Sequence, residues 1–74
     1  MGGKLMQEID SLVKMANQIA DNFEFHDDAG ERIADHLQRF WAPSMREKIV
    51  AHHVAGAAGL NPAAKAAVQR LAGA

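Results

Sequence analysis

Residues 36–46, HLQRFWAPSMR, contain the only tryptophan of the chain and one of its two prolines. Upstream of the proline, the spacing of one helical face recurs in Ile33, Leu37, Phe40 and Trp41. Pro43 has no N–H to donate and disfavours a helical backbone in the residue before it, so it ends a helix. It also suits the first turn of a new helix. This stretch therefore predicts a helix, a sharp corner and a second helix.

The side chains at this corner are large and apolar, or cationic. We expect Phe40 to fill the core, because few other large apolar residues compete for the interior. Trp41 follows directly and would point about 100° away on a helix, so we expect it at the core's edge, as an anchor for a partner. Met45 lies on the second arm of the corner. Arg39 and Arg46 flank the corner, and their planar guanidinium groups suit carboxylates of a partner.

An amphipathic helix is expected over residues 4–23, after a disordered start at residues 1–3. Its apolar positions alternate in steps of four and three: Leu5, Ile9, Leu12, Ala16, Ile19 and Phe23. That 3.5-residue period is also typical of coiled coils, so a homodimer through this seam is an alternative. Asn17 and Gln18 flank the seam, and their amides would be partner contacts if a second chain covered them.

Three more helices are expected, over residues 29–41, 44–55 and 62–72. No strand pattern is present, so the fold class is all-α, a small three- to four-helix bundle with the proline-marked corner between its second and third helices. We treat residues 1–74 as a single helical domain. The last helix is rich in alanine, and Val68 and Leu71 are its only sizeable apolar residues. We therefore expect the first three helices to provide most of the packing, and the last to fray or to wait for a partner.

Two of the predicted helix starts carry capping residues. Asp28 and Glu31 have the spacing of a capping box at the start of the second helix. Asn61 is a favoured N-cap residue, and Pro62 suits the first helical position directly after it. We therefore expect side-chain caps at the second and the last helix.

The composition excludes several classes of function. The chain has 74 residues and no cysteine, so it has no disulfide, thiolate metal site or thiol nucleophile. Its net charge of −1 supplies no field that attracts nucleic acid or an anionic membrane surface. It has no run of about 18 apolar residues for a membrane span, and its N-terminus lacks the apolar run of a signal peptide. We expect a cytoplasmic protein that binds neither nucleic acid nor membrane.

No catalytic constellation appears among the reactive side chains. The histidines are His26, His36, His52 and His53. The adjacent pair diverges by about 100° on a helix, which is a poor geometry for a shared metal ion. We expect His53 to be half-buried between helices and hydrogen-bonded through one nitrogen. No serine has the surroundings of a nucleophile elbow, and no glycine motif follows a strand. We expect a protein that is not an enzyme, with no catalytic, cofactor-binding or metal-binding residues.

One triplet suggests a different function. Asp10-Ser11-Leu12 looks like the phosphopantetheine attachment triplet of acyl carrier proteins, which are also small four-helix domains. In that family the serine begins the second helix, whereas Ser11 lies inside the first predicted helix. An acyl-carrier-like domain is therefore an alternative that ranks below a protein-interaction module.

Two blocks of the sequence carry a family resemblance: LVKMANQIA at residues 12–20 and, more specifically, HLQRFWAPSMR at residues 36–46. Ile49, His52 and the sequence GLNP at residues 59–62 extend it over most of the chain. Together these residues resemble the delta subunit family of NAD-dependent, molybdenum-containing formate dehydrogenases. The chain departs from the pattern in the last helix, where alanines stand at positions that are commonly bulkier.

The resemblance implies an accessory subunit and not a catalyst. Its partner would be a large catalytic subunit with a molybdenum bis-pterin guanine dinucleotide cofactor and iron–sulfur clusters, together with subunits that handle FMN and NAD. The family's role would be to assist assembly, stability or cofactor insertion of that complex, and this chain would bind no cofactor itself. The residues that we expect to contact the partner are Asn17, Gln18, Arg39, Phe40, Trp41, Met45 and Arg46.

Overall fold

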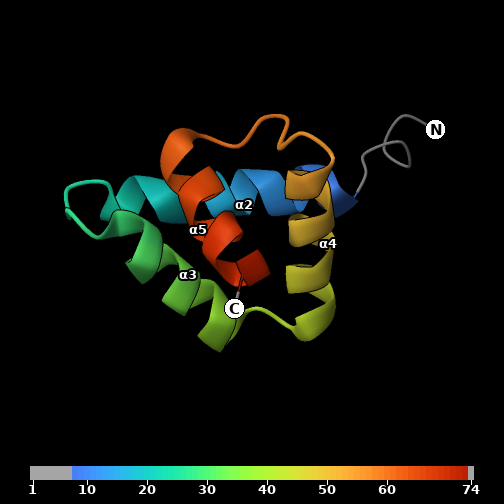
Figure 1. Cartoon of the computed structure of the whole chain (residues 1–74), viewed down its shortest axis with the longest axis horizontal. Helices are drawn as coiled ribbons and strands as arrows, with labels where there is room; N and C mark the ends of the chain where they lie inside the picture. Colours follow the sequence, from blue (N-terminus) through green and yellow to red (C-terminus); the bar gives the residue numbers. More distant parts are fainter. Residues whose placement is uncertain (1–7, 74) are drawn as a thin grey trace.

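Four helices and no strand make up the part of the chain that the computed structural model describes, residues 8–73 (Figure 1). They are α2 (Glu8–Phe23), α3 (Ala29–Phe40), α4 (Pro43–Val54) and α5 (Pro62–Gly73). The predicted all-α class is confirmed, and the observed ends of the last three helices lie within one residue of the predicted ends. The predicted disorder at residues 1–3 and the predicted start of the first helix at residue 4 lie outside the described residues.

The corner between α3 and α4 forms at the proline, as predicted. Trp41 leaves the helix with an extended backbone (ψ 142°), and Ala42 continues it (ψ 151°). Pro43 then opens α4. The N–H of Trp41 still donates to the carbonyl oxygen of Leu37 at 3.0 Å, which closes the last turn of α3. The chain therefore turns within two residues, because Pro43 keeps the residue before it out of the helical conformation.

The helix α5 lies among the other three helices and contacts each of them. In Figure 1, α2 runs horizontally beneath the α4–α5 loop, α3 descends from one end of it and α4 stands at the other side. The last helix, α5, packs against all three and most extensively against α3. None of the described helices is both long enough and apolar enough to cross a membrane.

The packing of α5 corrects the expectation that the first three helices provide most of the core. Ala64, Ala67 and Val68 have no exposed surface. The reason is the small size of alanine, which lets helices approach closely. A Cβ atom placed on Gly30 of α3 would lie only 3.2 Å from the Cβ of Ala66. The alanine-rich helix was expected to pack weakly, but it packs closely against α3. Its small side chains let the two backbones approach each other, and this close contact takes the place of contacts between bulky side chains.

The core contains apolar residues from every helix and from the α4–α5 loop. Its members are Leu12, Ala16, Ala20, Ile33, Ala34, Leu37, Trp41, Ile49, Ala57, Leu60, Ala64, Ala67 and Val68. Of the described residues of the α2 seam, Leu12 and Ala16 lie inside this cluster, and Ile9, Ile19 and Phe23 pack partly against it. The described residues therefore give no support to the homodimer alternative.

The two predicted caps have different outcomes. Asn61 caps α5 as predicted, because its Oδ1 accepts a hydrogen bond from the N–H of Ala64 at 2.8 Å. The predicted capping box at Asp28 is wrong, since its side chain makes no capping hydrogen bond. Its carboxylate accepts instead from Nε of Arg32 at 2.7 Å. The backbone of Asp28 (φ −104°, ψ 37°) lies outside the extended region that N-cap residues usually adopt.

Candidate partner-binding face

The two aromatic residues of the corner occupy the opposite positions from those predicted. Trp41 is 6% exposed and belongs to the core, whereas Phe40 is 72% exposed. Helical spacing accounts for these positions once the buried side of α3 is known. The buried residues of α3 are Ile33, Ala34 and Leu37; Trp41 lies four residues after Leu37, near the centre of that stripe, whereas Phe40 lies at its edge. Of these two aromatic side chains, the one available to a partner is therefore that of Phe40.

The two arginines of the corner are not equivalent. Arg46 is half-buried, and its Nη1 donates to the carbonyl oxygens of Trp41 (2.5 Å) and Gln38 (3.2 Å). These bonds satisfy carbonyl groups that the end of α3 leaves without helical partners. Arg39 forms an exposed ion pair with Asp35 at 3.0 Å. Of the two, Arg39 is the more exposed, whereas the guanidinium group of Arg46 is held against the end of α3.

The two amide residues that were predicted to contact a partner, Asn17 and Gln18, also have different environments. Asn17 is half-buried. Both the nitrogen and the oxygen of its side-chain amide form hydrogen bonds with the loop before α5. Its Nδ2 donates to the carbonyl oxygen of Gly59 at 2.8 Å, and its Oδ1 accepts from the N–H of Asn61 at 2.9 Å. Gln18 is exposed. Asn17 therefore holds the fold together, and Gln18 is the amide that faces solvent.

A row of rings connects α2 with the outer side of α3. The ring of His36 lies 4.7 Å from that of Phe40 and 6.2 Å from that of Phe23, measured between centroids. The ring of His26 lies 6.2 Å from that of Phe23. The sequence reasoning did not select Phe23 or His36 as surface residues. The four-residue spacing of His36 and Phe40 on one helix was the signal that predicts their contact.

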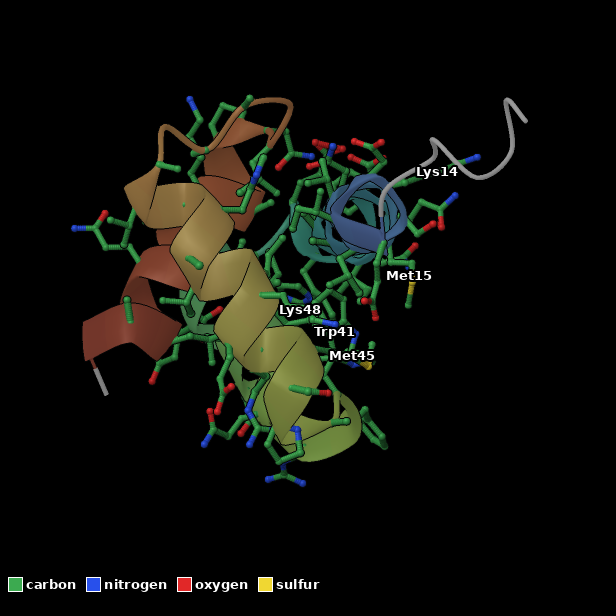
Figure 2. All side chains as sticks on the ribbon, turned by 90° about the vertical axis from the view of Figure 1, so that its right-hand side faces the viewer. Lys14, Met15, Trp41, Met45 and Lys48 are labelled. Carbon is green, nitrogen blue, oxygen red and sulfur yellow. The ribbon has the colours of Figure 1, made fainter. Side chains whose placement is uncertain are left out.

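The row continues along α2 to the corner. Met15, Ile19 and Phe23 follow one another at four-residue spacing; Met15 is 38% exposed and the other two are half-buried. In Figure 2, the labelled side chains of Met15 on α2 and Met45 on α4 lie on the side of the molecule away from α5. We call this surface the Met–Phe face, and it consists of Met15, Ile19, Phe23, His36, Phe40 and Met45.

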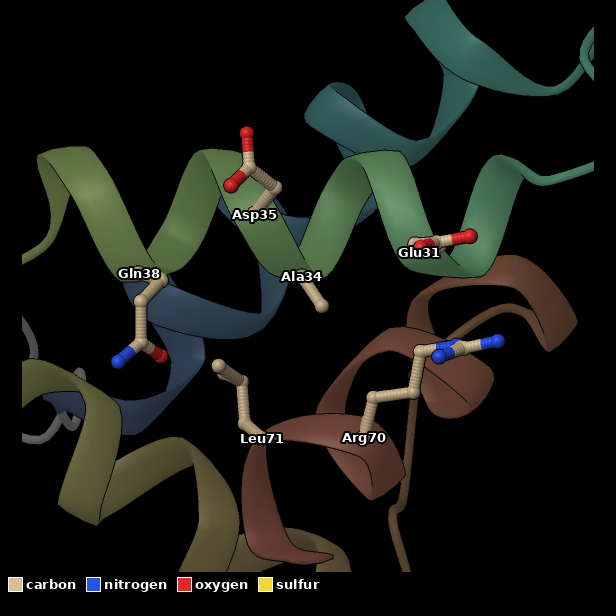
Figure 3. Close-up of a pocket in the computed structure, with 6 residues that line it drawn as sticks. All are labelled: Glu31, Ala34, Asp35, Gln38, Arg70 and Leu71. Carbon is tan, nitrogen blue, oxygen red and sulfur yellow. The ribbon is translucent and has the colours of Figure 1, made fainter. Parts of the chain in front are cut away.

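A shallow hollow of about 230 Å³ lies elsewhere, between α3 and α5. Figure 3 shows residues of α3 facing the two residues of α5 across it. Its lining residues are Glu31, Ala34, Asp35, Gln38, Arg70 and Leu71. The lining mixes carboxylates, an amide and a guanidinium group, but it contains no serine, threonine, cysteine or histidine.

The histidines do not converge. Within residues 8–73, no group of three or more His, Cys, Asp or Glu side chains is arranged to hold a metal ion. His52 places its Nε2 2.7 Å from the carbonyl oxygen of Ala58. His53 is half-buried, as predicted, and its Nδ1 has no hydrogen-bond partner in the described part of the chain.

Comparison with known proteins identifies the family. The model of the family described as NADH-dependent formate dehydrogenase delta subunit FdsD matches residues 11–68, which is more than half of the chain. The matched range includes α3, α4 and most of α2, together with both blocks that carried the resemblance. No curated protein and no solved structure matches the chain. The chain therefore belongs to the family of NADH-dependent formate dehydrogenase delta subunits.

Proposed function

We propose that this chain is a non-catalytic accessory subunit that assists assembly, stability or cofactor insertion of an NAD-dependent molybdenum formate dehydrogenase complex. Membership of the delta subunit family supports this role. The cytoplasmic location expected from the sequence remains a prediction.

In this proposal the redox chemistry belongs to the partner subunits. The molybdenum bis-pterin guanine dinucleotide cofactor, the iron–sulfur clusters, FMN and NAD are bound there, and this chain binds none of them. Its contribution is a protein surface that the large catalytic subunit recognises. Such a contact stabilises the assembled state by mass action, because it binds the folded partner and not the unfolded one.

The exposure of Phe40 is the observation that carries the proposal. A phenylalanine that is 72% exposed beside a turn leaves a large apolar area in water. Buried aromatic anchors supply much of the binding energy in protein interfaces. Of the residues that the sequence nominated, Gln18, Arg39 and Phe40 are exposed and Met45 is half-buried, so we assign direct contact to these four.

Three nominated residues take an indirect role in the proposal. Trp41 is buried beneath the corner, Arg46 binds the end of α3, and Asn17 binds the loop before α5. They shape the surface that carries Phe40 and need not touch the partner. A substitution at one of them would weaken binding because it destabilises the fold. A measurement of stability therefore has to accompany each binding measurement on such a variant.

The test is co-production of the formate dehydrogenase subunits with and without this chain. We expect the chain to co-purify with the large catalytic subunit, and we expect less assembled, molybdenum-loaded complex when it is absent. Molybdenum content and the sedimentation profile of the complex are the readouts. Equal yield, equal molybdenum content and equal assembly without the chain would contradict the proposal.

A further inference from the structure

We infer that the turn between α2 and α3 docks into an apolar pocket of the catalytic subunit whose rim carries lysine or arginine side chains. The turn comprises residues 24–28, and its apolar anchor is Phe25. This inference rests on the proposed function and adds to it a further contact surface and the chemistry of the partner at that surface. The sequence nominated no residue of this turn as a partner contact.

Phe25 is the most exposed large apolar side chain in the described part of the chain, at 88%. The turn itself does not require an aromatic ring there. Its backbone is closed by the N–H of His26, which donates to the carbonyl oxygen of Phe23 at 3.0 Å, and by the N–H of Ala29, which donates to that of His26 at 3.1 Å. Positions within turns are usually occupied by small or polar residues. The ring of Phe25 therefore leaves a large apolar area in water that a partner would bury.

The position of the turn suits insertion into a pocket. In Figure 1 it projects beyond the helices at one end of the molecule. The two backbone hydrogen bonds fix it between α2 and α3, and the ring of His26 lies 6.2 Å from that of Phe23 on α2, measured between centroids. An anchor on a fixed turn loses less conformational freedom on binding than one on a mobile segment. Phe25 is therefore presented at the tip of the molecule on a preorganised backbone.

The charges around Phe25 have one sign. Residues 21–31 contain five of the nine Asp and Glu residues of the chain and none of its eight Lys and Arg residues. In the turn, Asp28 is paired with Arg32 of α3. Glu24 and Asp27 stand on either side of Phe25, are exposed, and form no ion pair with any residue that the structure describes. A partner with cations around an apolar pocket would complement both the ring and these two carboxylates.

A second copy of this chain complements the turn less well. It would offer the hollow between α3 and α5 to the ring of Phe25, and one guanidinium group, that of Arg70, lines that hollow. The same lining carries Glu31 and Asp35, which would lie against the carboxylates of the turn and oppose association. Negative charge equally disfavours the phosphate groups of nucleic acid and of an anionic membrane. Within residues 8–73, no carboxylates are grouped to hold a metal ion.

The first experiment measures binding of the full chain to the formate dehydrogenase complex prepared without its delta subunit. We expect Phe25→Ser to bind about tenfold more weakly or worse, as for loss of a buried aromatic anchor. The matched control is Val54→Ser, which removes an apolar side chain that is 77% exposed at the end of α4 and outside the turn. The control should bind within about twofold of the unchanged chain. Circular dichroism should show unchanged helicity in both variants, because both side chains are mostly exposed.

The second experiment tests the charge of the pocket's rim. Glu24→Lys should weaken binding about fivefold at low salt and by less as salt is added, because it places a cation against cations. Glu47→Lys is the matched control, since Glu47 is an exposed glutamate on α4 and its substitution changes the net charge by the same amount. The control should bind within about twofold of the unchanged chain. Equal effects of the two substitutions would overturn the inferred cationic rim.

The outcomes separate the inference from the function beneath it. If the unchanged chain fails to bind the complex, the proposed function fails. If it binds and Phe25→Ser binds equally well, the function stands and the inferred docking turn is wrong. If sedimentation shows that the chain alone is a dimer that Phe25→Ser dissociates, the turn joins two copies and the inferred partner is wrong.

Discussion

Arg46 donates a hydrogen bond from Nη1 to the backbone carbonyl of Trp41 across the proline corner, at 2.5 Å. A second bond from the same nitrogen reaches the carbonyl oxygen of Gln38 at 3.2 Å. One cation in the first turns of α4 therefore binds the end of α3. Because hydrogen bonds from charged donors are stronger than neutral ones, this contact helps to hold the two helices together at the corner.

Replacing Arg46 by alanine should lower the free energy of unfolding by about 1–2 kcal/mol, since two carbonyl groups lose a charged donor. Urea unfolding followed by far-UV circular dichroism measures this quantity. Arg39→Ala is the matched control, because its ion pair with Asp35 is exposed and such pairs contribute about 0–1 kcal/mol. A larger loss for Arg39→Ala than for Arg46→Ala would contradict the assignment of roles.

Trp41→Ala should destabilise the protein far more than Phe40→Ala. Removal of a buried aromatic side chain costs about 3–5 kcal/mol, which approaches the whole stability of many small domains. Phe40 is mostly exposed, so its truncation should change the free energy of unfolding by less than about 1 kcal/mol. Thermal and urea unfolding by circular dichroism compare the two variants. The reverse order would mean that Phe40, and not Trp41, belongs to the core.

The helices of this protein were predictable because their signals are local. Pro43 marks the corner and Asn61 with Pro62 marks the start of α5, and each acts within a few residues of its own position. The positions of Phe40 and Trp41 were not predictable in this way. They depend on which side of α3 the other helices cover, and the burial of Ala34 beside Ile33 and Leu37 centres the buried stripe nearer to Trp41 than to Phe40.

The candidate face was only partly visible in the sequence. Arg39, Phe40 and Met45 were nominated from the corner alone. Met15 and His36 were missed, because their membership depends on α2 packing beside α3 and α4. The role of α5 was missed for a related reason. A count of bulky residues does not reveal how closely a helix of alanines can approach its neighbours.

Asn17→Ala should lower the free energy of unfolding by about 1–3 kcal/mol, because the loop before α5 loses a donor and an acceptor together. The carbonyl of Gly59 and the N–H of Asn61 would both need new partners. Gln18→Ala, one residue away and exposed, is the control and should change stability by less than about 0.5 kcal/mol. Hydrogen exchange should show faster exchange of the Asn61 amide in the Asn17 variant alone.

Gly30 tests the close packing of α3 on α5. Gly30→Val should cost about 1–3 kcal/mol, as overpacking does, because its Cβ would start 3.2 Å from the Cβ of Ala66 and its methyl groups would extend further. The control Gly73→Val places the same side chain where a Cβ meets nothing within 4 Å. Urea midpoints should fall for the Gly30 variant and stay nearly unchanged for the control. Similar midpoints for both variants would show that α3 and α5 are not in close contact at Gly30.

The pair of Asp28 and Arg32 predicts how the start of α3 responds to acid. The hydrogen bond from Arg32 lowers the pKa of Asp28 below its ordinary value of 3.8. A carboxyl group whose pKa is lower in the folded state stabilises the fold above its unfolded-state pKa. That contribution disappears as the pH falls through the folded-state pKa. Loss of stability from this pair should therefore begin near pH 4 and continue below it.

Substitution of Arg32 by glutamine should raise the pKa of Asp28 toward 3.8, since the charged donor is removed. Carbon NMR of the Asp28 carboxyl group across an acid titration measures this shift directly. Both residues of the pair are substantially exposed, so the pKa is a more sensitive readout than the unfolding free energy. Added salt should weaken the charge attraction in the unchanged protein and move its Asp28 pKa in the same direction. An Asp28 pKa that is equal in the two proteins would show that Arg32 is not bound to it in solution.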